Sequence, residues 1–327
     1  MSPLSGVWSY VKIGKPRIQR MTRGARCPWR RASFLLTAVF ASACSPAEID
    51  SSGIVGTLED KAIDEASGLA VSRRRPDALW VINDDGPAVL YAVSTSGKSL
   101  GHARLADASN RDWEDLASYD VQGQSYLLVA DIGDNESRRD AVRLYVLPEP
   151  GVDMSQTMHG RRIDYRYPDG PRDAEAIAVD VENERVLILS KRDIPAVLYS
   201  VSLSDSADAE QTATRLGVVA SLPQPGHSDI AAAPIDLDWH WQPTAMDISA
   251  DGAAAVILTP SGVYLYRRTA GEDWSDALQR QPQLISRSKN SKAESIAFDA
   301  TGNAIYITLE QVNAPLFRLD VDGVPDQ

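Results

Sequence analysis

Short apolar runs alternate with turn-forming residues along most of this chain. In the stretch from residue 67 to residue 105, four runs (67–72, 78–83, 89–94 and 100–105) are separated by Pro-, Asp- and Gly-rich segments. Apolar runs of four to eight residues bounded by such turns are typical of β-strands. No stretch after residue 44 shows a long helical period, so the pattern predicts an all-β protein.

Five segments begin in the same way and indicate an internal repeat. They read Ser67-Gly-Leu-Ala, Glu114-Asp-Leu-Ala, Glu175-Ala-Ile-Ala, Thr244-Ala-Met-Asp and Glu294-Ser-Ile-Ala. Each opens a unit of strand-like runs, and repeats at this spacing are typical of propellers and solenoids. We call these five first residues the heads.

The last unit lacks one run, and residues 53–58 supply it. They form an apolar run that belongs to no other unit, and an N-terminal strand in the last blade would close the ring without a free edge. We therefore predict a five-bladed β-propeller of four-stranded blades. The long interval 223–242 leaves a sixth blade open, although its Pro, Asp, His and Trp residues favour a loop.

The first 43 residues have the composition of an export leader. They contain eight Lys or Arg residues, no acidic residue, and an apolar run just before Cys44. These are the parts of a signal peptide, and the run is shorter than the roughly 20 residues of a membrane-spanning helix. Cys44 after Ala-Ser-Ala resembles a lipobox, so we expect lipidation of Cys44, with ordinary cleavage nearby as the alternative. A start at Met21 would give a leader of ordinary length, and Arg30-Arg31 leaves twin-arginine export open.

These features divide the chain into a leader (1–43), a lipid-anchor tether (44–52) and a β-propeller (53–327). We expect an exported protein that is lipid-anchored in the cell envelope, in the periplasm or at the outer membrane. We also expect a monomer that contacts the membrane through its anchor only. Its ligand would be a small molecule or another envelope component.

Charge and cysteine content narrow the chemistry. The chain has 33 Lys and Arg residues against 45 Asp and Glu residues, and without the leader only 25 basic residues remain. Such an acidic surface argues against nucleic acid and anionic membranes as partners. Both cysteines, Cys27 and Cys44, precede the propeller, which therefore has no disulfide and no thiolate zinc site.

The heads are candidate ligands of a metal ion. In a propeller the first strand of each blade runs along the central channel, so all five heads face one mouth. Glutamates that converge there raise each other's pKa unless a cation neutralises them, and oxygen ligands suit calcium better than zinc or iron. The candidate Ca²⁺ ligands are Ser67, Glu114, Glu175, Thr244 and Glu294. Alternatively, the glutamates only hydrogen-bond backbone amides at the channel wall and hold the blades in register.

The order of the heads resembles a known family. Calcium-activated nucleotidases of the apyrase type are five-bladed propellers with a channel calcium and the ligand order Ser, Glu, Glu, Ser, Glu, from which Thr244 departs. Asp112-Trp-Glu114 and Asp173-Ala-Glu175 also resemble calcium-dependent propeller phytases and phytase-like esterases. The pairing of Asp-Trp-Glu-Asp with Asp131-Ile-Gly-Asp-Asn135 is similar to bacterial β-propeller lipoproteins, over nearly the whole propeller, and implies no particular reaction.

The apyrase and phytase resemblance implies hydrolysis of a phosphoric ester. The second strands of the blades end at the mouth where the heads begin, which places Asp84, Asp131, Asp134, Lys191 and Arg192 there. An aspartate would act as general base, and Lys191 and Arg192 would offset charge on the phosphoryl group beside a metal-bound water. Alternatively, the two cations balance the carboxylates, and residues 131–135 are an ordinary turn. The chain lacks the dense basic clusters of phytases and the base-stacking residues of the nucleotidases.

Two functional hypotheses follow. The first is a calcium-binding propeller with phosphohydrolase- or esterase-like activity at the acidic mouth, and the second is a non-catalytic propeller that binds a protein or a glycan. A further cluster in the loop, His227, Asp229, Asp236, Asp238 and His240, suggests a second metal or, alternatively, a solvated loop.

Overall fold

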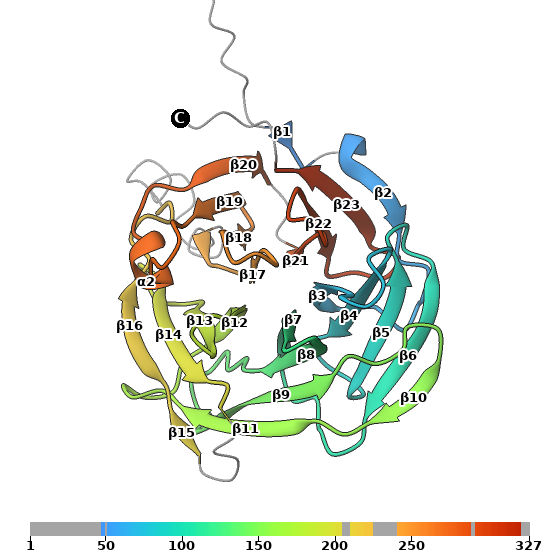
Figure 1. Ribbon diagram of the computed structural model, residues 1–327, viewed down its shortest axis with the longest axis horizontal. Helices are drawn as coiled ribbons and strands as arrows, with labels where there is room; N and C mark the ends of the chain where they lie inside the picture. Colours follow the sequence, from blue (N-terminus) through green and yellow to red (C-terminus); the bar gives the residue numbers. More distant parts are fainter. Residues whose placement is uncertain (1–46, 50, 205–209, 225–240, 289–291, 322–327) are drawn as a thin grey trace, which may run out of the picture. The chain divides into compact units, whose positions relative to one another are not determined.

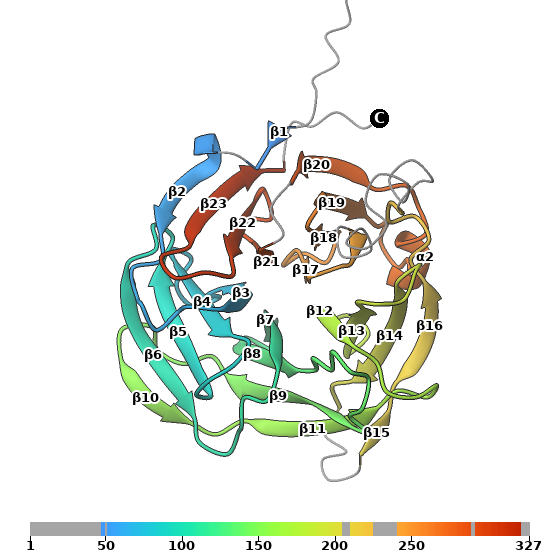
Figure 2. The same ribbon diagram turned by 180° about the vertical axis from the view of Figure 1, so that it is seen from behind.

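Five β-sheets surround one axis in this computed structural model (Figure 1; Figure 2 shows the reverse face). The structure describes residues 47–49, 51–204, 210–224, 241–288 and 292–321. The chain divides into the units Met1–Cys44 and Ser45–Gln327, and the sheets belong to the second. The leader, Cys44 and the loop cluster from His227 to His240 lie outside the described residues.

Each sheet is one blade of a five-bladed β-propeller, as the repeat predicted. From the channel outward, blade 1 contains β3 (Ala66–Val71), β4 (Ala78–Asn83), β5 (Val89–Ser94) and β6 (Ser99–Leu105). Blade 2 contains β7 (Trp113–Val121), β8 (Gln124–Asp131), β9 (Val142–Pro148) and β11 (Arg161–Arg166). Blade 3 contains β12 (Ala174–Asp180), β13 (Arg185–Ser190), β14 (Val197–Ser202) and β16 (Thr214–Val218). Blade 4 contains β17 (Ala245–Ile248), β18 (Ala254–Thr259), β19 (Gly262–Arg267) and β20 (Gln283–Arg287). Blade 5 contains β21 (Ala293–Phe298), β22 (Ala304–Leu309), β23 (Pro315–Asp320) and β2 (Ile54–Thr57).

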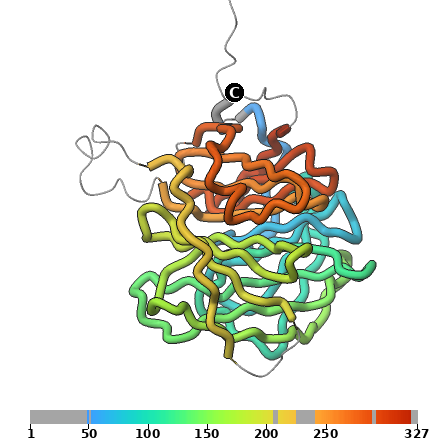
Figure 3. The backbone as a smooth tube through the Cα atoms, turned by 60° about the vertical axis from the view of Figure 1, so that its left-hand side comes forward, coloured from blue at the N-terminus to red at the C-terminus, as the bar shows by residue number. Residues whose placement is uncertain are grey.

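The N-terminal strand closes the ring. β2 pairs antiparallel with β23, with Ile54 opposite Phe317 and Thr57 opposite Pro315. Figure 3 shows this blue segment beside the red C-terminal strands. The last blade is therefore built from both ends of the propeller, which confirms the predicted closure and joins the two ends of a cyclic repeat.

Three short strands, which the sequence pattern did not reveal, fasten neighbouring blades at the rim. β10 (Ser155–Met158) pairs parallel with β6, β15 (Gln211–Thr212) with β11, and β1 (Ala47–Glu48) with β20. Each of them precedes the outer strand of one blade and adds a fifth strand to the blade before it. They cover the outer edges of blades 1, 2 and 4, which would otherwise present unpaired N–H and C=O groups.

The two remaining junctions are fastened differently. Between blades 3 and 4 lies the short helix α2 (Trp274–Ala277), after which Gln279 donates a 2.7 Å hydrogen bond to the carbonyl of Val218. Between blades 5 and 1, the N–H of Glu59 donates a 2.9 Å bond to Gly97 O. Gly56 packs so closely on Ser96 that an added Cβ would lie 2.9 Å from Ser96 Cα. A larger residue than Gly56 would separate the two blades.

The apolar second strands provide the core. Every residue of β4, β18 and β22 is buried, because each of these strands is covered by a neighbouring blade on both faces. The 3-10 turn η1 (Ser51–Gly53) precedes β2. Among the described residues, no helix has the length and apolar character needed to span a membrane.

The channel interior is held together by a buried carboxylate, Asp115, which follows the head Glu114. Asp115 is 0% exposed, and it accepts hydrogen bonds from the backbone N–H groups of Leu116 (2.8 Å), Ile177 (2.8 Å) and Met246 (3.3 Å). One side chain on blade 2 thereby binds the first strands of blades 3 and 4. Burial raises the pKa of Asp115 well above its usual value, although the three N–H donors act in the opposite direction.

Replacement of Asp115 should loosen three blades at once. In Asp115→Ala, three buried N–H groups lose their acceptor, and we expect the free energy of unfolding to fall by about 3 kcal/mol or more, since each unsatisfied buried donor costs about 1–3 kcal/mol. Denaturant unfolding monitored by circular dichroism measures this change. Asp120→Ala, at an exposed position of the same strand, is the matched control, and equal effects of the two substitutions would contradict the role assigned to Asp115.

A second channel carboxylate, Asp247, predicts a pH dependence. Its oxygens accept 2.8 Å hydrogen bonds from the N–H groups of Ile248 and Phe298, and burial raises its pKa to about 6, against the opposing charge of Arg73. An unfolded aspartate titrates near about pH 4, so the stabilisation from this raised pKa is complete below about pH 4. It is lost as the pH rises through about 6. Asp247→Asn does not ionise, so its melting temperature should gain on that of the wild type between pH 4 and 7. A difference that stays constant over this range would rule out the titration.

Candidate metal centre at the channel mouth

Four of the five heads occupy β-bulges. The register between the first and second strands shifts at the same place in blades 1, 2, 3 and 5, and the extra residues are Ser67, Glu114, Glu175 and Glu294. A bulge re-aims the side chain of its extra residue, and bulges are common beside functional sites. Blade 4 has no such shift, and Thr244 lies just before its first strand.

The four bulged heads line one cavity of about 170 Å³. The other described residues that line it are Asp84, Asp112, Asn135, Lys191 and Glu310. The cavity therefore brings together four of the five predicted ligands and two of the predicted catalytic residues, Asp84 and Lys191. Thr244, Asp131, Asp134 and Arg192 are not among the described residues that line it.

A buried carboxylate cluster at this mouth consists of Glu114, Asp173 and Glu175. All three are buried, and one oxygen of each lies within 4.8 Å of the others. Burial first, and then the charge of Asp112, raise the pKa of Glu114 well above its usual value. Burial likewise raises the pKa of Glu294 to about 8, with help from Glu310. The carboxylates of this mouth thus outnumber the positive charges that would keep them ionised.

Two cations already pair with this cluster. The ammonium of Lys191 contacts Glu175 Oε1, whereas Glu175 Oε2 is buried and has no hydrogen-bond partner among the described residues. Arg192 Nε lies 2.7 Å from Asp173 Oδ2, and the same guanidinium donates to the side-chain oxygen of Asn135. These ion pairs are consistent with the alternative role of Lys191 and Arg192, in which the two cations balance the charge of the carboxylates.

The two hydroxyl heads bond to the backbone of the following blade. Ser67 Oγ donates a 2.6 Å hydrogen bond to the carbonyl of Trp113, and Thr244 Oγ1 donates a 2.9 Å bond to that of Ala293. Both therefore hold neighbouring first strands together. Ser67 also lines the cavity, where its oxygen has a lone pair to spare.

The loop after β8 supports the cluster from behind. Asp131 is fully buried and pairs at 2.7 Å with Arg139, whose guanidinium also donates a 2.7 Å bond to Gly133 O. Asp134 Oδ2 accepts a 2.7 Å bond from the N–H of Arg139, and the N–H of Asp134 donates a 2.9 Å bond to Asp173 Oδ1. Asp131 and Asp134 are thus engaged within this loop, which positions Asp173.

The close packing of two carboxylates against Gly133 explains why the loop has glycine at this position. A Cβ at Gly133 would lie 2.6 Å from Asp112 Oδ2 and would overlap the carboxylate of Glu114. Only a residue without a side chain lets these two carboxylates pack against the loop.

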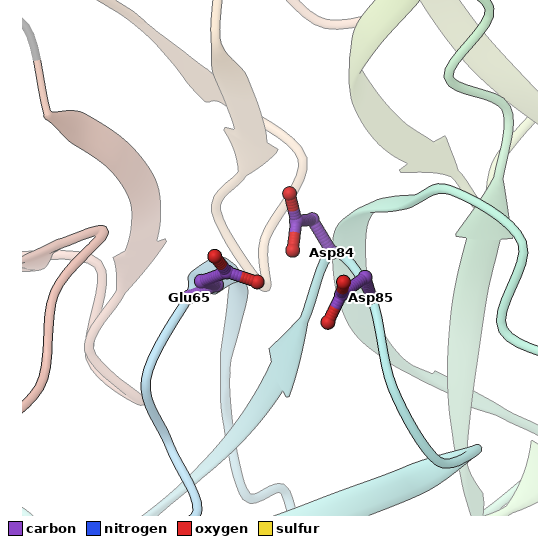
Figure 4. Close-up of side chains that lie close together, drawn as sticks. All are labelled: Glu65, Asp84 and Asp85. Carbon is purple, nitrogen blue, oxygen red and sulfur yellow. The ribbon is translucent and has the colours of Figure 1, made fainter.

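A second group of carboxylates adjoins the mouth in blade 1. Glu65, Asp84 and Asp85 each have an oxygen within 4.8 Å of the others, and their carboxylates face one another in Figure 4. The charge of Asp84, and then burial, raise the pKa of Glu65 to about 7. Glu65 and Asp85 are partly or fully exposed, so solvent screens this group more than the buried cluster.

Sequence reasoning missed two residues of the site, Glu65 and Arg139. Glu65 precedes the head Ser67 by two residues, as Asp112 precedes Glu114 and Asp173 precedes Glu175, so the acidic residue two before a head is the signal that identifies it. Arg139 has no comparable signal, because its pairing with Asp131 depends on how the loop folds back.

Comparisons with known proteins identify no family for this chain. No protein-family model matches the chain, and no curated protein matches its sequence. A chain in the crystal structure of a nidogen/laminin complex is similar over 79% of this chain and 77% of that one, at 12% identity and a TM-score of 0.43. A second similarity, to Chaetomium thermophilum Raptor, covers 84% of this chain and 30% of that one, at 10% identity and a TM-score of 0.42. Similarities this low indicate neither a family nor a reaction, and the resemblance to apyrases and phytases stays a prediction.

The buried pair between Arg139 and Asp131 provides a test of the supporting loop. Arg139→Met leaves the carboxylate of Asp131 buried without its partner, and breaking a buried pair in this way costs about 3–5 kcal/mol of unfolding free energy. Arg138→Met removes a cation from the neighbouring, exposed position and should cost less than about 1 kcal/mol. Adding Asp131→Asn to Arg139→Met should recover part of the loss. Similar unfolding midpoints for the two single variants would contradict this role of the pair.

Proposed function

We propose that this propeller binds a divalent cation, Ca²⁺, at the acidic mouth of its channel. Glu114, Asp173 and Glu175 would hold the ion, with Glu294 and Ser67 on the same cavity. The observation that carries the proposal is the buried Glu175 Oε2, which lies in a cluster of three carboxylates and has no hydrogen-bond partner among the described residues. A buried anionic oxygen without a partner is costly, and a bound cation would remove that cost.

The donor set favours calcium over other divalent ions. All described side chains that line the cavity offer oxygen atoms except that of Lys191, and Ca²⁺ accepts about six to eight oxygens in a flexible geometry. Zinc sites use mainly cysteine and histidine, which the described residues lining this cavity do not include. The cavity of about 170 Å³ is large enough for an ion with several of its waters.

Such an ion would connect blade 5 to blades 2 and 3, with which it is not consecutive in the chain. Glu114 belongs to blade 2, Asp173 and Glu175 to blade 3, and Glu294 to blade 5. Binding would neutralise carboxylates that otherwise raise each other's pKa, so the ion would stiffen the ring at this end of the channel.

Hydrolysis of a phosphoric ester is a second candidate function at the same mouth. It is supported by Asp84, whose Oδ1 has no hydrogen-bond partner among the described residues and which lines the cavity together with Lys191. The cavity is, however, smaller than the roughly 300–1,000 Å³ of most small-molecule sites. Cation binding is therefore the function we favour, and a non-catalytic propeller that binds a protein or a glycan is its alternative. We further propose that Cys44 anchors the protein in the cell envelope.

Calcium titration of the purified protein tests the proposed site. We expect isothermal titration calorimetry to show one Ca²⁺ site and the melting temperature to rise with calcium. Glu175→Gln removes one ionised ligand and should weaken binding roughly 10- to 100-fold, a loss of about 1.4–2.8 kcal/mol. Glu136→Gln, in the exposed part of the loop after β8, is the control and should bind like the wild type. If calcium changed neither heat nor melting temperature, the proposed site would be wrong.

The same preparations separate binding from catalysis. Nucleoside diphosphates and a generic phosphomonoester are offered with and without Ca²⁺, and phosphate release is measured. Calcium-dependent release that Asp84→Asn abolishes would support the hydrolase, whereas calcium binding without release would favour a structural or ligand-binding role.

A further inference from the structure

We infer that Lys191 is an internal competitor of the cation, which occupies the mouth when no metal is bound and sets the affinity of the site. The inference rests on the proposed cation site and names the residue that sets the affinity of that site. Its starting point is that the ion pair of Lys191 is made with Glu175, the carboxylate whose second oxygen is left without a partner.

Lys191 is unusual for its place in the fold. It follows directly after the second strand of blade 3, and the corresponding residues of the other blades are Asp84, Ile132, Pro260 and Glu310. Blade 3 is thus the one blade with a cation at this position. Its side chain is 19% exposed, so the ammonium lies among the carboxylates and still has a route to solvent.

The ammonium of Lys191 acts on more than one blade. Besides its contact with Glu175, its charge lowers the pKa of Glu114 from blade 2 and of Glu294 from blade 5, against the burial that raises both. These are the carboxylates that a bound cation would neutralise. One ammonium and one divalent ion therefore serve the same groups, and each repels the other.

The surroundings of Lys191 suit an exchange between the two cations. Its backbone is fixed, because its N–H donates a 2.9 Å hydrogen bond to Asp173 O, but its side chain is a flexible four-carbon stem. Arg192, by contrast, is tied through its guanidinium to both Asp173 and Asn135. We therefore expect Lys191, and not Arg192, to leave the cluster when a divalent ion enters.

Removal of the ammonium should tighten calcium binding. In the full-length protein, Lys191→Met should lower the Kd for Ca²⁺ at least about tenfold in calorimetry, and should lower the melting temperature without calcium. Lys292→Met is the matched control: it removes a lysine near the same mouth whose ammonium donates a 3.0 Å bond to Glu310 O and which also acts on Glu294. We expect Lys292→Met to change the Kd less than about threefold. The charge-conserving Lys191→Arg should also change it less than about threefold.

A second measurement uses the wild-type protein and does not depend on the folding of a variant. If calcium expels the ammonium, acetylation of Lys191 by acetic anhydride, quantified by mass spectrometry of peptides, should increase when Ca²⁺ is saturating. Acetylation of Lys292 should not change. Unchanged or reduced labelling of Lys191 at saturating calcium would overturn the inference.

The outcomes distinguish the inference from the proposed function. If the wild type binds calcium and Lys191→Met binds it equally or more weakly, the role of Lys191 is wrong and the cation site stands. If only Lys191→Met binds calcium, Lys191 is the resident cation and the proposed function fails for the natural protein. If neither protein binds calcium, both proposals are wrong.

Discussion

Strands that run along one axis bring their first residues together, and charges brought together in this way have to be neutralised. This constraint follows from the closed ring, because each blade contributes the start of its first strand to the same mouth. In four blades a bulge places the head there, and three of those four heads are glutamates. The chain meets the constraint with Lys191 and Arg192 next to the cluster and with a loop that donates an N–H group to Asp173. The raised pKa values of Glu114 and Glu294 indicate that this neutralisation is incomplete.

The channel interior meets the same constraint mainly with backbone N–H groups. Asp115 and Asp247 accept hydrogen bonds from backbone N–H groups of neighbouring first strands, so the ring itself supplies their partners. Those bonds join blades 2, 3, 4 and 5, which makes the two carboxylates part of the scaffold. A carboxylate with N–H donors has its hydrogen-bonding capacity used, whereas Glu175 Oε2 at the mouth has no such donor. The chemistry of the site therefore depends on where along the channel a carboxylate lies.

The fold could be predicted from local patterns, because each blade is made of strands that follow one another in the chain. Apolar runs separated by turns gave the blade count, and the unassigned run 53–58 gave the closure. The strands β1, β10 and β15 could not be found in this way, since each has only two to four residues and pairs with a different blade. The sequence repeat identified the heads of the site. It did not reveal the β-bulges that direct four of the heads toward the cavity. The absence of a bulge in blade 4 explains why Thr244, which matches the pattern, lies outside the cavity.

The same distinction applies to the polar loop after β8. From the sequence, Asp131 and Asp134 look equivalent to Asp84, because all three follow a second strand at the mouth. Their difference comes from Arg139, which folds back to pair with Asp131 Oδ1 and to donate its N–H to Asp134 Oδ2, so that both carboxylates are held within this loop. Blade 1 has no arginine at the corresponding place, and Asp84 lines the cavity, whereas Asp131 and Asp134 are not among the described residues that line it. The loop after β8 thus supports the carboxylate cluster, whereas the loop after β4 contributes Asp84 to the cavity. This difference between two repeated units makes the blade 1 side of the mouth a candidate for ligand chemistry.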